Sequence, residues 1–159
     1  MIDTSMPLDL FHLMSQALNE AKKGGSEGEV PVGAVLATQE GEIVARAHNH
    51  PITLNDPSAH AEILVMRKAG LALENYRLTN TILVVTIEPC PMCMGAALHA
   101  RIAQVVFGAA DPKAGAAGSV YNLAADERLN HRIEVTPGIM ENECRTLMQN
   151  FFKARRGSK

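Results

Sequence analysis

The fold is decided by residues 81–98, which read TILVVTIEPCPMCMGAAL. Residues 81–87 are rich in β-branched side chains, and the run is short enough to form one buried strand. Pro91 suits the first turn of a helix that follows directly. Cys90 and Cys93 are therefore predicted to lie at a strand-to-helix junction, where the helix N-terminus favours thiolate over thiol.

A second helix is predicted upstream of this junction. It runs from about Ala59 to Ala69, with Ser58 as its N-cap and Gly70 just beyond its end. This start places His60 in the first turn and Glu62 two positions later. The two motifs, H-A-E and P-C-P-M-C, thus each occur at a predicted helix start.

The remaining elements follow from apolar periodicity and turn residues. They are a helix over 8–22 stopped by Gly24 and Gly25, strands over 32–37 and 43–47 joined by a polar connection, strands over 104–108 and 133–136, a loop over 109–119, and a helix over 140–156. Strands that alternate with helices predict an α/β fold, in which a partly parallel sheet has helices on both faces. The early hairpin makes the sheet mixed.

Length and composition indicate a globular protein. The chain has 159 residues, which fits a single domain over 1–159. With 47% hydrophobic and 20% charged residues, it lacks the composition of a disordered chain. The formal net charge of -2 predicts no general affinity for polyanions, so RNA binding would need a local basic patch.

Three features predict a cytoplasmic location. No apolar run reaches the roughly 18 residues needed to cross a bilayer, and the first residues are acidic where a signal peptide is basic. The 3 cysteines are an odd number with two of them close together, which suits a metal or redox pair in a reducing compartment. Cys144, the third, is expected to be a small buried hydrophobe on the last helix.

One imidazole and two thiolates, from His60, Cys90 and Cys93, would give zinc three ligands and leave a fourth position open. A structural zinc needs a fourth protein ligand, and no further His or Cys lies at ligand spacing. Glu62 could fill that position, but residues two apart on a helix point in different directions. We therefore expect one catalytic zinc ion per chain, with Glu62 reaching its water molecule.

Such a site is suited to hydrolytic deamination. Zinc lowers the pKa of its water towards roughly 7, which provides hydroxide near neutral pH for attack on an amidine-like carbon. Glu62 can then deliver protons to the ring nitrogen and to the departing amine. The alternative, a redox C-x-x-C pair, needs neither the histidine nor the glutamate and usually sits in a thioredoxin-like chain. The other histidines are expected to be structural, and none is predicted to bind metal: His12, His48, His50, His99 and His131.

The chain resembles the bacterial-type tRNA adenosine deaminases of the cytidine/deoxycytidylate deaminase superfamily, whose signature joins H-x-E to P-C-x-x-C. The resemblance covers nearly the whole chain and includes EVPVGA at 29–34, DPSAHAE at 56–62, EPC at 88–90, VFGA at 106–109 and FF at 151–152. It implies a three-layer α/β/α fold with a mixed sheet of about five strands. It also implies a homodimer, with no membrane association and no nucleotide cofactor.

The function implied by this resemblance is hydrolytic deamination of adenosine to inosine at the wobble position of a tRNA anticodon. His60, Cys90 and Cys93 would bind zinc, and Glu62 would shuttle protons. Substrate contacts are implied at Asn49, Val30, Pro31, Ala61, Glu88 and Asp111.

Two alternatives remain open. Guanine deaminases resemble this chain in the same segments, 59–62 and 88–93, and act on a free base. The loop 114–119 after Asp111, the segment Asn130–Arg132 and a basic C-terminal helix favour RNA, with phosphate contacts expected from Lys153, Arg155 and Arg156. The second alternative is a zinc-containing RNA- or protein-binding domain without catalysis, which would have no use for an acid beside an open coordination position.

Overall fold

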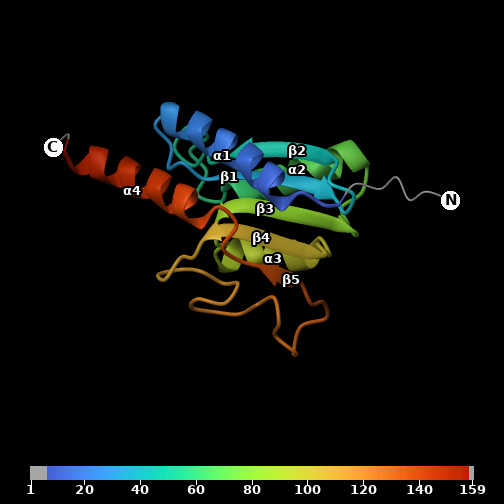
Figure 1. The fold of residues 1–159 in the computed structure, drawn as a ribbon. Helices are drawn as coiled ribbons and strands as arrows, with labels where there is room; N and C mark the ends of the chain where they lie inside the picture. The colour runs from blue at the N-terminus through green and yellow to red at the C-terminus, as the bar shows by residue number, and fades with distance from the viewer. Residues whose placement is uncertain (1–6, 158–159) are drawn as a thin grey trace.

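The computed structural model describes residues 7–157, which are built around a five-stranded sheet in the order β2-β1-β3-β4-β5 (Figure 1). The strands are β1 (Gly33–Thr38), β2 (Ile43–His48), β3 (Thr81–Ile87), β4 (Gln104–Ala109) and β5 (Glu134–Thr136). β1 pairs antiparallel with both β2 and β3, whereas β3 pairs parallel with β4, and β4 with β5. The predicted mixed sheet is confirmed.

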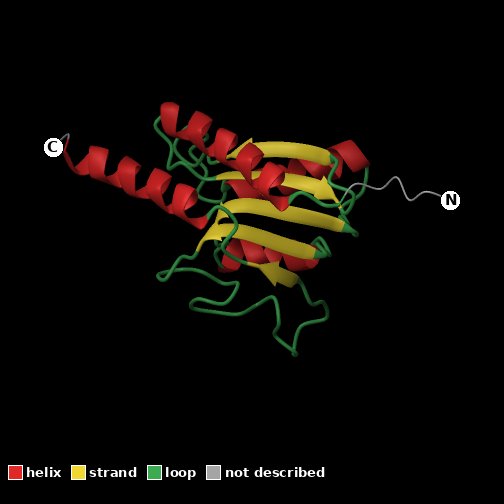
Figure 2. Cartoon of the chain, viewed as in Figure 1, coloured by secondary structure: helices red, strands yellow, loops and turns green. Residues whose placement is uncertain are grey.

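Helices cover both faces of this sheet (Figure 2). They are α1 (Leu10–Ser26), α2 (Ala61–Leu73), α3 (Pro91–His99) and α4 (Glu141–Gly157). Helices α1 and α4 pack on one face, and α2 and α3 pack on the other. The expected three-layer α/β/α arrangement is confirmed. Within residues 7–157, no helix has the length and apolar character that crossing a membrane requires.

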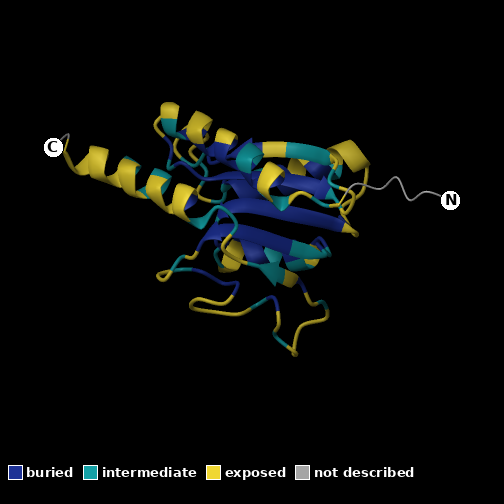
Figure 3. Cartoon of the chain, in the orientation of Figure 1, coloured by how far each residue is buried: buried dark blue, intermediate teal, exposed yellow. Residues whose placement is uncertain are grey.

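The two faces of the central strands fill two separate cores. In β3, Leu83 and Val85 point into the core shared with α2 and α3, while Ile82 and Val84 point into the core shared with α1. A strand buried on both faces reads as a continuous apolar run, which is why 81–87 lacks a polar alternation. Figure 3 shows these strands buried between the more exposed helices.

The predicted helix ends at glycines were wrong. Helix α1 continues through Gly24 and Gly25, and α2 continues through Gly70 to Leu73. A glycine inside a helix costs only about 1 kcal/mol relative to alanine, so packing can override it. At Gly24 the reason is close approach, because a Cβ atom there would lie 3.0 Å from Cδ2 of His48.

Gly33 allows the backbone of α1 to rest directly on β1. A Cβ atom on Gly33 would lie 2.0 Å from the Ala17 carbonyl oxygen and 2.4 Å from the Ala21 amide nitrogen. Both atoms belong to helix backbone, which cannot rotate away as a side chain would.

We therefore expect Gly33→Ala to lower the free energy of unfolding by about 1–3 kcal/mol, the usual cost of overpacking. The matched control is Gly95→Ala, because nothing lies within 4 Å of a Cβ atom there and alanine favours the α3 helix. Urea denaturation at equal zinc content measures both. Equal stability of the two variants would contradict the proposed contact between α1 and β1.

Candidate metal centre

Three predicted ligands meet where α2 and α3 begin. His60 directly precedes α2, Cys90 is the N-cap of α3, and Cys93 lies in the first turn of α3. The Nδ1 atom of His60 lies 3.7 Å from Sγ of Cys90 and 3.5 Å from Sγ of Cys93. Each residue offers one ligand atom, and these atoms all lie within 4.8 Å of one another. The geometry suits one metal ion between them.

The fold brings these ligands together because α2 and α3 pack on the same face of the sheet. Strand β3 ends just before Cys90, so its end fixes the position of the α3 N-terminus. Pro91 is the first residue of α3, where a backbone N–H group would have no intrahelical acceptor. The proline therefore costs no hydrogen bond, and the helix can follow the strand directly. The strand-to-helix junction predicted for the two cysteines is confirmed.

Electrostatics in this cluster favour a bound cation. A hydrogen bond from the Cys93 thiol, assisted by His60, lowers the pKa of the Cys90 thiol to about 4. The same hydrogen bond and burial raise the pKa of Cys93. Without a metal ion, the two cysteines therefore share one proton, with Cys90 as the thiolate and Cys93 as the thiol. A soft divalent cation can replace that proton, and two thiolates with one imidazole are ligands that zinc prefers.

Glu62 lies beside the cluster, in the first turn of α2. Its side chain is only 3% exposed, and burial raises the pKa of its carboxyl group, although a hydrogen bond with Cys93 acts in the opposite direction. A raised pKa makes a carboxyl group a better proton acceptor, as general acid–base transfer requires.

The start of α2 differs from the prediction. His60, not Ser58, is the N-cap residue, and its side chain makes no capping hydrogen bond. The Ala61 amide instead donates to Oδ1 of Asn49 at 2.8 Å, while the hydroxyl and amide of Ser58 donate to Oδ1 of Asp56. A side chain from outside the helix thus caps it, which frees the His60 imidazole to face the cysteines.

Asn49 lies at the end of β2 and is buried. Its Oδ1 atom is used by Ala61, and none of residues 7–157 accepts a hydrogen bond from its Nδ2 atom. Of the other predicted contacts, Ala61 and Pro31 are buried and Val30 is half-buried.

Glu88 holds the loop after β4 in place. Its side chain is 2% exposed, and its carboxylate accepts hydrogen bonds from the amides of Asp111, Ala117 and Ser119 and from the Ser119 hydroxyl. A Cβ atom on Gly115 would lie 2.3 Å from Cδ of Glu88, so the loop wraps closely around this carboxylate. Four hydrogen bonds occupy the acceptor capacity of the group, which therefore organises the loop.

The three basic residues predicted to contact RNA lie on α4. Lys153, Arg155 and Arg156 are exposed near the end of α4. Helix α4 projects beyond the sheet edge towards which β3 and β4 point (Figure 1). The Arg155 guanidinium stacks 5.1 Å from the centre of the Phe151 ring. Cys144, in contrast, lies on the buried face of α4, as expected for a small hydrophobe.

Two buried carboxylates were missed by sequence analysis. Glu29 accepts hydrogen bonds from the Ile52 amide and from the amide and hydroxyl of Thr53, which fixes the segment between β2 and α2. The carboxylate of Glu20 is hydrogen-bonded to the His48 ring. A glutamate in a helical or loop pattern reads as surface, so the sequence carries no signal that its partners will bury it.

Comparison with known proteins places this site in a family. The family model of the cytidine and deoxycytidylate deaminase zinc-binding region matches residues 9–109, which include His60, Cys90 and Cys93. The tRNA-specific adenosine deaminase of Bacillus subtilis (strain 168) is 49% identical over 146 residues, 92% of this chain and 90% of the relative.

Two solved structures are also similar. One comes from structural studies of A-to-I editing by tRNA:A34 deaminases at the wobble position of transfer RNA. It has a TM-score of 0.82 and 43% identity, and the match covers 86% of this chain and 98% of the solved chain. Guanine deaminase from Bacillus subtilis has a TM-score of 0.63 and 38% identity, and covers 70% of this chain and 71% of its own.

The matched region is a zinc-binding region, and the ligand chemistry of the cluster fits that metal, so the cofactor is zinc, one ion per chain. Since the family match spans more than half of the chain and carries the whole cluster with it, this chain belongs to the cytidine and deoxycytidylate deaminase family.

Proposed function

We propose that this chain is a tRNA adenosine deaminase, which hydrolyses the wobble adenosine of an anticodon to inosine and ammonia. The observation that carries the proposal is the meeting of the His60, Cys90 and Cys93 cluster with the buried carboxyl group of Glu62. Three ligands leave one position of a tetrahedral site open, and an acid beside it can move protons. The similarity to tRNA adenosine deaminases supports the substrate class.

The proposed mechanism assigns proton transfer to Glu62. His60, Cys90 and Cys93 would hold the zinc ion, which makes water nucleophilic near neutral pH when bound. Oxygen from water bonds to C6 of adenine, and the bond from C6 to the exocyclic nitrogen breaks. Glu62 takes one proton from water and passes it to the ring nitrogen N1. It then takes the proton of the hydroxyl group on C6 and passes it to the amine, which leaves as ammonia. Its buried position supports this, because the raised pKa lets the carboxyl group hold a proton between transfers.

The flipped nucleotide is proposed to be held by Asn49, Val30, Pro31, Ala61 and Asp111. Asn49 has its Nδ2 atom available as a donor, because only Oδ1 is used to cap α2. Asp111 uses Oδ1 to accept from the amides of Lys113 and Ala114, which leaves Oδ2 for a ribose 2′-hydroxyl group. Glu88 is proposed to act on the substrate by fixing the loop that carries Asp111, since its own acceptors are occupied.

The wobble base of an anticodon is already single-stranded, so moving it into a pocket costs at most a few kcal/mol. Neighbouring nucleotides can then be read on their edges and their 2′-hydroxyl groups. Lys153, Arg155 and Arg156 are proposed to contact phosphates, which the exposure of this end of α4 supports. Because the net charge is -2, this local basic cluster would have to supply the attraction.

The two alternatives are less well supported. Among the solved structures, the tRNA:A34 deaminase chain matches 86% of this chain at 43% identity, whereas the guanine deaminase of Bacillus subtilis matches 70% at 38% identity. A zinc-containing domain without catalysis would gain nothing from burying Glu62, since taking a carboxyl group out of water costs stability.

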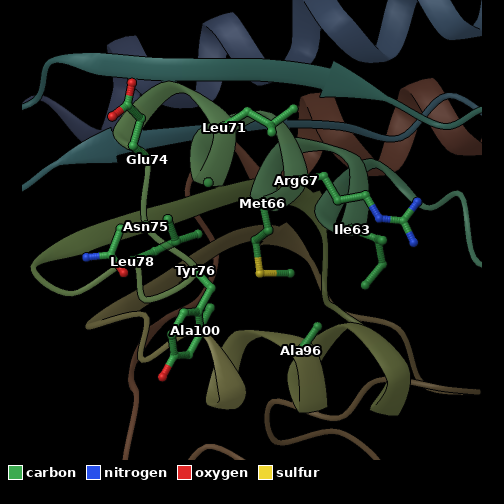
Figure 4. A pocket seen from close by; sticks show the side chains of 11 residues that line it. Ile63, Met66, Arg67, Leu71, Glu74, Asn75, Tyr76, Leu78, Ala96 and Ala100 are labelled. Atoms are coloured by element: carbon green, nitrogen blue, oxygen red, sulfur yellow. The ribbon is translucent and has the colours of Figure 1, made fainter.

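The chain is further proposed to act as a cytoplasmic homodimer. A groove of about 890 Å³ lies between α2 and α3, and apolar side chains such as Met66 line it (Figure 4). On its rim, Leu71 and Tyr76 are 82% and 77% exposed, so the groove and its rim together present apolar side chains to solvent. The groove also carries Arg67 and Glu74, a cation and an anion that a two-fold contact can pair with their counterparts. The cytoplasm is where a bacterial tRNA substrate would be met.

If Cys90 is a zinc ligand, Cys90→Ala is expected to lose both the metal and all deaminase activity, because two remaining ligands hold zinc poorly. Cys144→Ala is the matched control, since this buried thiol is outside the cluster and its loss should leave zinc content and rate nearly unchanged. Elemental analysis and a rate measurement on the same sample provide the test. An active, metal-free Cys90→Ala protein would disprove the assignment.

For Glu62, the isosteric change Glu62→Gln is expected to keep one zinc ion per chain and to lower the single-turnover rate by about a thousandfold, or ~4 kcal/mol of barrier. The amide fills the same volume but cannot shuttle protons. Glu42→Gln, an exposed change of the same type, should leave the rate unaltered. Loss of zinc from Glu62→Gln would instead identify Glu62 as a ligand.

The substrate proposal is tested with an anticodon stem-loop RNA, its all-DNA counterpart, free guanine and free cytosine, all at one salt concentration. We expect inosine to form in the RNA, more slowly in the DNA because Asp111 loses its 2′-hydroxyl partner, and no ammonia from either free base. Rapid turnover of guanine without inosine in the RNA would refute the tRNA substrate and leave the deaminase assignment intact.

A further inference from the structure

A second group of potential metal ligands lies outside the deaminase site. Glu27, His48 and His50 each offer one ligand atom, and these atoms lie within 4.8 Å of one another. They come from the C-cap of α1, the last residue of β2 and the segment that follows β2. Sequence analysis assigned both histidines a structural role, so the cluster is a product of the fold.

The two ring nitrogens of His48 face two carboxylates. Nδ1 lies 3.0 Å from Oε2 of Glu20, and Nε2 lies 2.9 Å from Oε2 of Glu27. A neutral imidazole has one N–H group, and if that group donates to Glu20, the Nε2 lone pair faces a carboxylate lone pair. Such a contact requires a cation between the two atoms, either a proton on Nε2 or a metal ion. A carboxylate that orients one ring nitrogen is also how proteins prepare the other to bind metal.

His50 distinguishes between these two cations. Among residues 7–157, its Nδ1 atom is the buried side-chain nitrogen or oxygen that has no hydrogen-bond partner. A buried polar atom without a partner costs about 1–3 kcal/mol. The His48 and His50 rings lie side by side, with centroids 4.4 Å apart. A proton on Nε2 of His48 would give Glu27 a hydrogen-bond donor but would leave Nδ1 of His50 without a partner. A metal ion could bind Glu27, His48 and His50 together.

The charge around the cluster also favours a cation. Glu20 and Glu27 flank His48, and the carboxylate of Glu29 lies close enough to His50 for their charges to interact. Lys23 offsets part of this charge through its ion pair with Glu20 at 3.3 Å. Three carboxylates around two imidazoles and one ammonium group leave the pocket negative when both histidines are neutral.

We propose that Glu27, His48 and His50 form a second, exchangeable binding site for a divalent transition metal such as zinc. Two imidazoles and one carboxylate suit zinc, nickel, cobalt or copper, without the thiolates of the first site. The Glu27 side chain is 48% exposed, so the ion would exchange with solvent. Bound metal would tie the end of α1 to the segment that carries Asn49.

The experiment adds Co²⁺ to the zinc-loaded protein and follows its visible spectrum and metal content. We expect one further equivalent per chain with weak ligand-field bands, no thiolate-to-cobalt charge-transfer band and no release of zinc. Glu27→Gln and His50→Asn should each abolish this equivalent. Glu20→Gln should weaken it about 10–100-fold, because Glu20 orients His48. His12→Asn, a change at an exposed histidine of α1, should leave it unchanged.

Several results would overturn the site. One is that the wild-type protein takes up no further cobalt. Another is that charge-transfer bands appear as zinc is released, which places the cobalt at the cysteines. A third is that Glu27→Gln and His50→Asn bind as much as the wild type. Glu27 is half-exposed, so Glu27→Gln keeps the test usable if His50→Asn does not fold.

Discussion

The hydrogen bond from the Ala61 amide to Oδ1 of Asn49, 2.8 Å long, is the contact on which the site depends. It fixes where α2 begins relative to the end of β2. Because it caps the helix from outside, the His60 side chain is not needed as a cap and can face the cysteines. Glu62 follows one residue after Ala61, so its carboxyl group is placed by the same contact. One capping interaction therefore positions a metal ligand, the proposed proton-transfer group and a proposed substrate contact together.

Buried carboxylates organise the segments around this site. Glu29 orders the segment before α2, Glu88 orders the loop after β4, and Glu20 holds the His48 ring. Burying a carboxylate is costly unless hydrogen bonds replace its water, so each one requires a particular loop geometry. Loops near an active site would otherwise be the most mobile part of the fold. Glu62 differs, because hydrogen bonds compensate its burial only in part and the pKa of its carboxyl group rises, which suits the proton transfer proposed for it.

The segment from His48 to His50 connects the two clusters of ligands. In extended backbone, successive side chains point to opposite sides. His48 and His50 accordingly lie beside each other towards Glu27, while Asn49 reaches the start of α2. Whatever cation satisfies His48 and Glu27 therefore also restrains the backbone on which Asn49 is carried. The first cluster offers two thiolates and the proposed second site a half-exposed carboxylate, so we expect the second to exchange its metal more readily.

The sequence by itself determined the elements, their order and the zinc ligands. Strand 81–87 is apolar throughout, and His60, Cys90 and Cys93 are residue types with few other uses at that spacing, so local pattern was enough to predict them. It failed at Gly24, where a buried glycine serves close packing and not a helix end. The tertiary structure alone decided that Asn49 caps α2, that Glu88 is enclosed by a loop, and that Glu27 meets two histidines. These contacts join residues far apart along the chain. Each polar group can be buried because a distant partner hydrogen-bonds it, and a local sequence pattern does not reveal that partner.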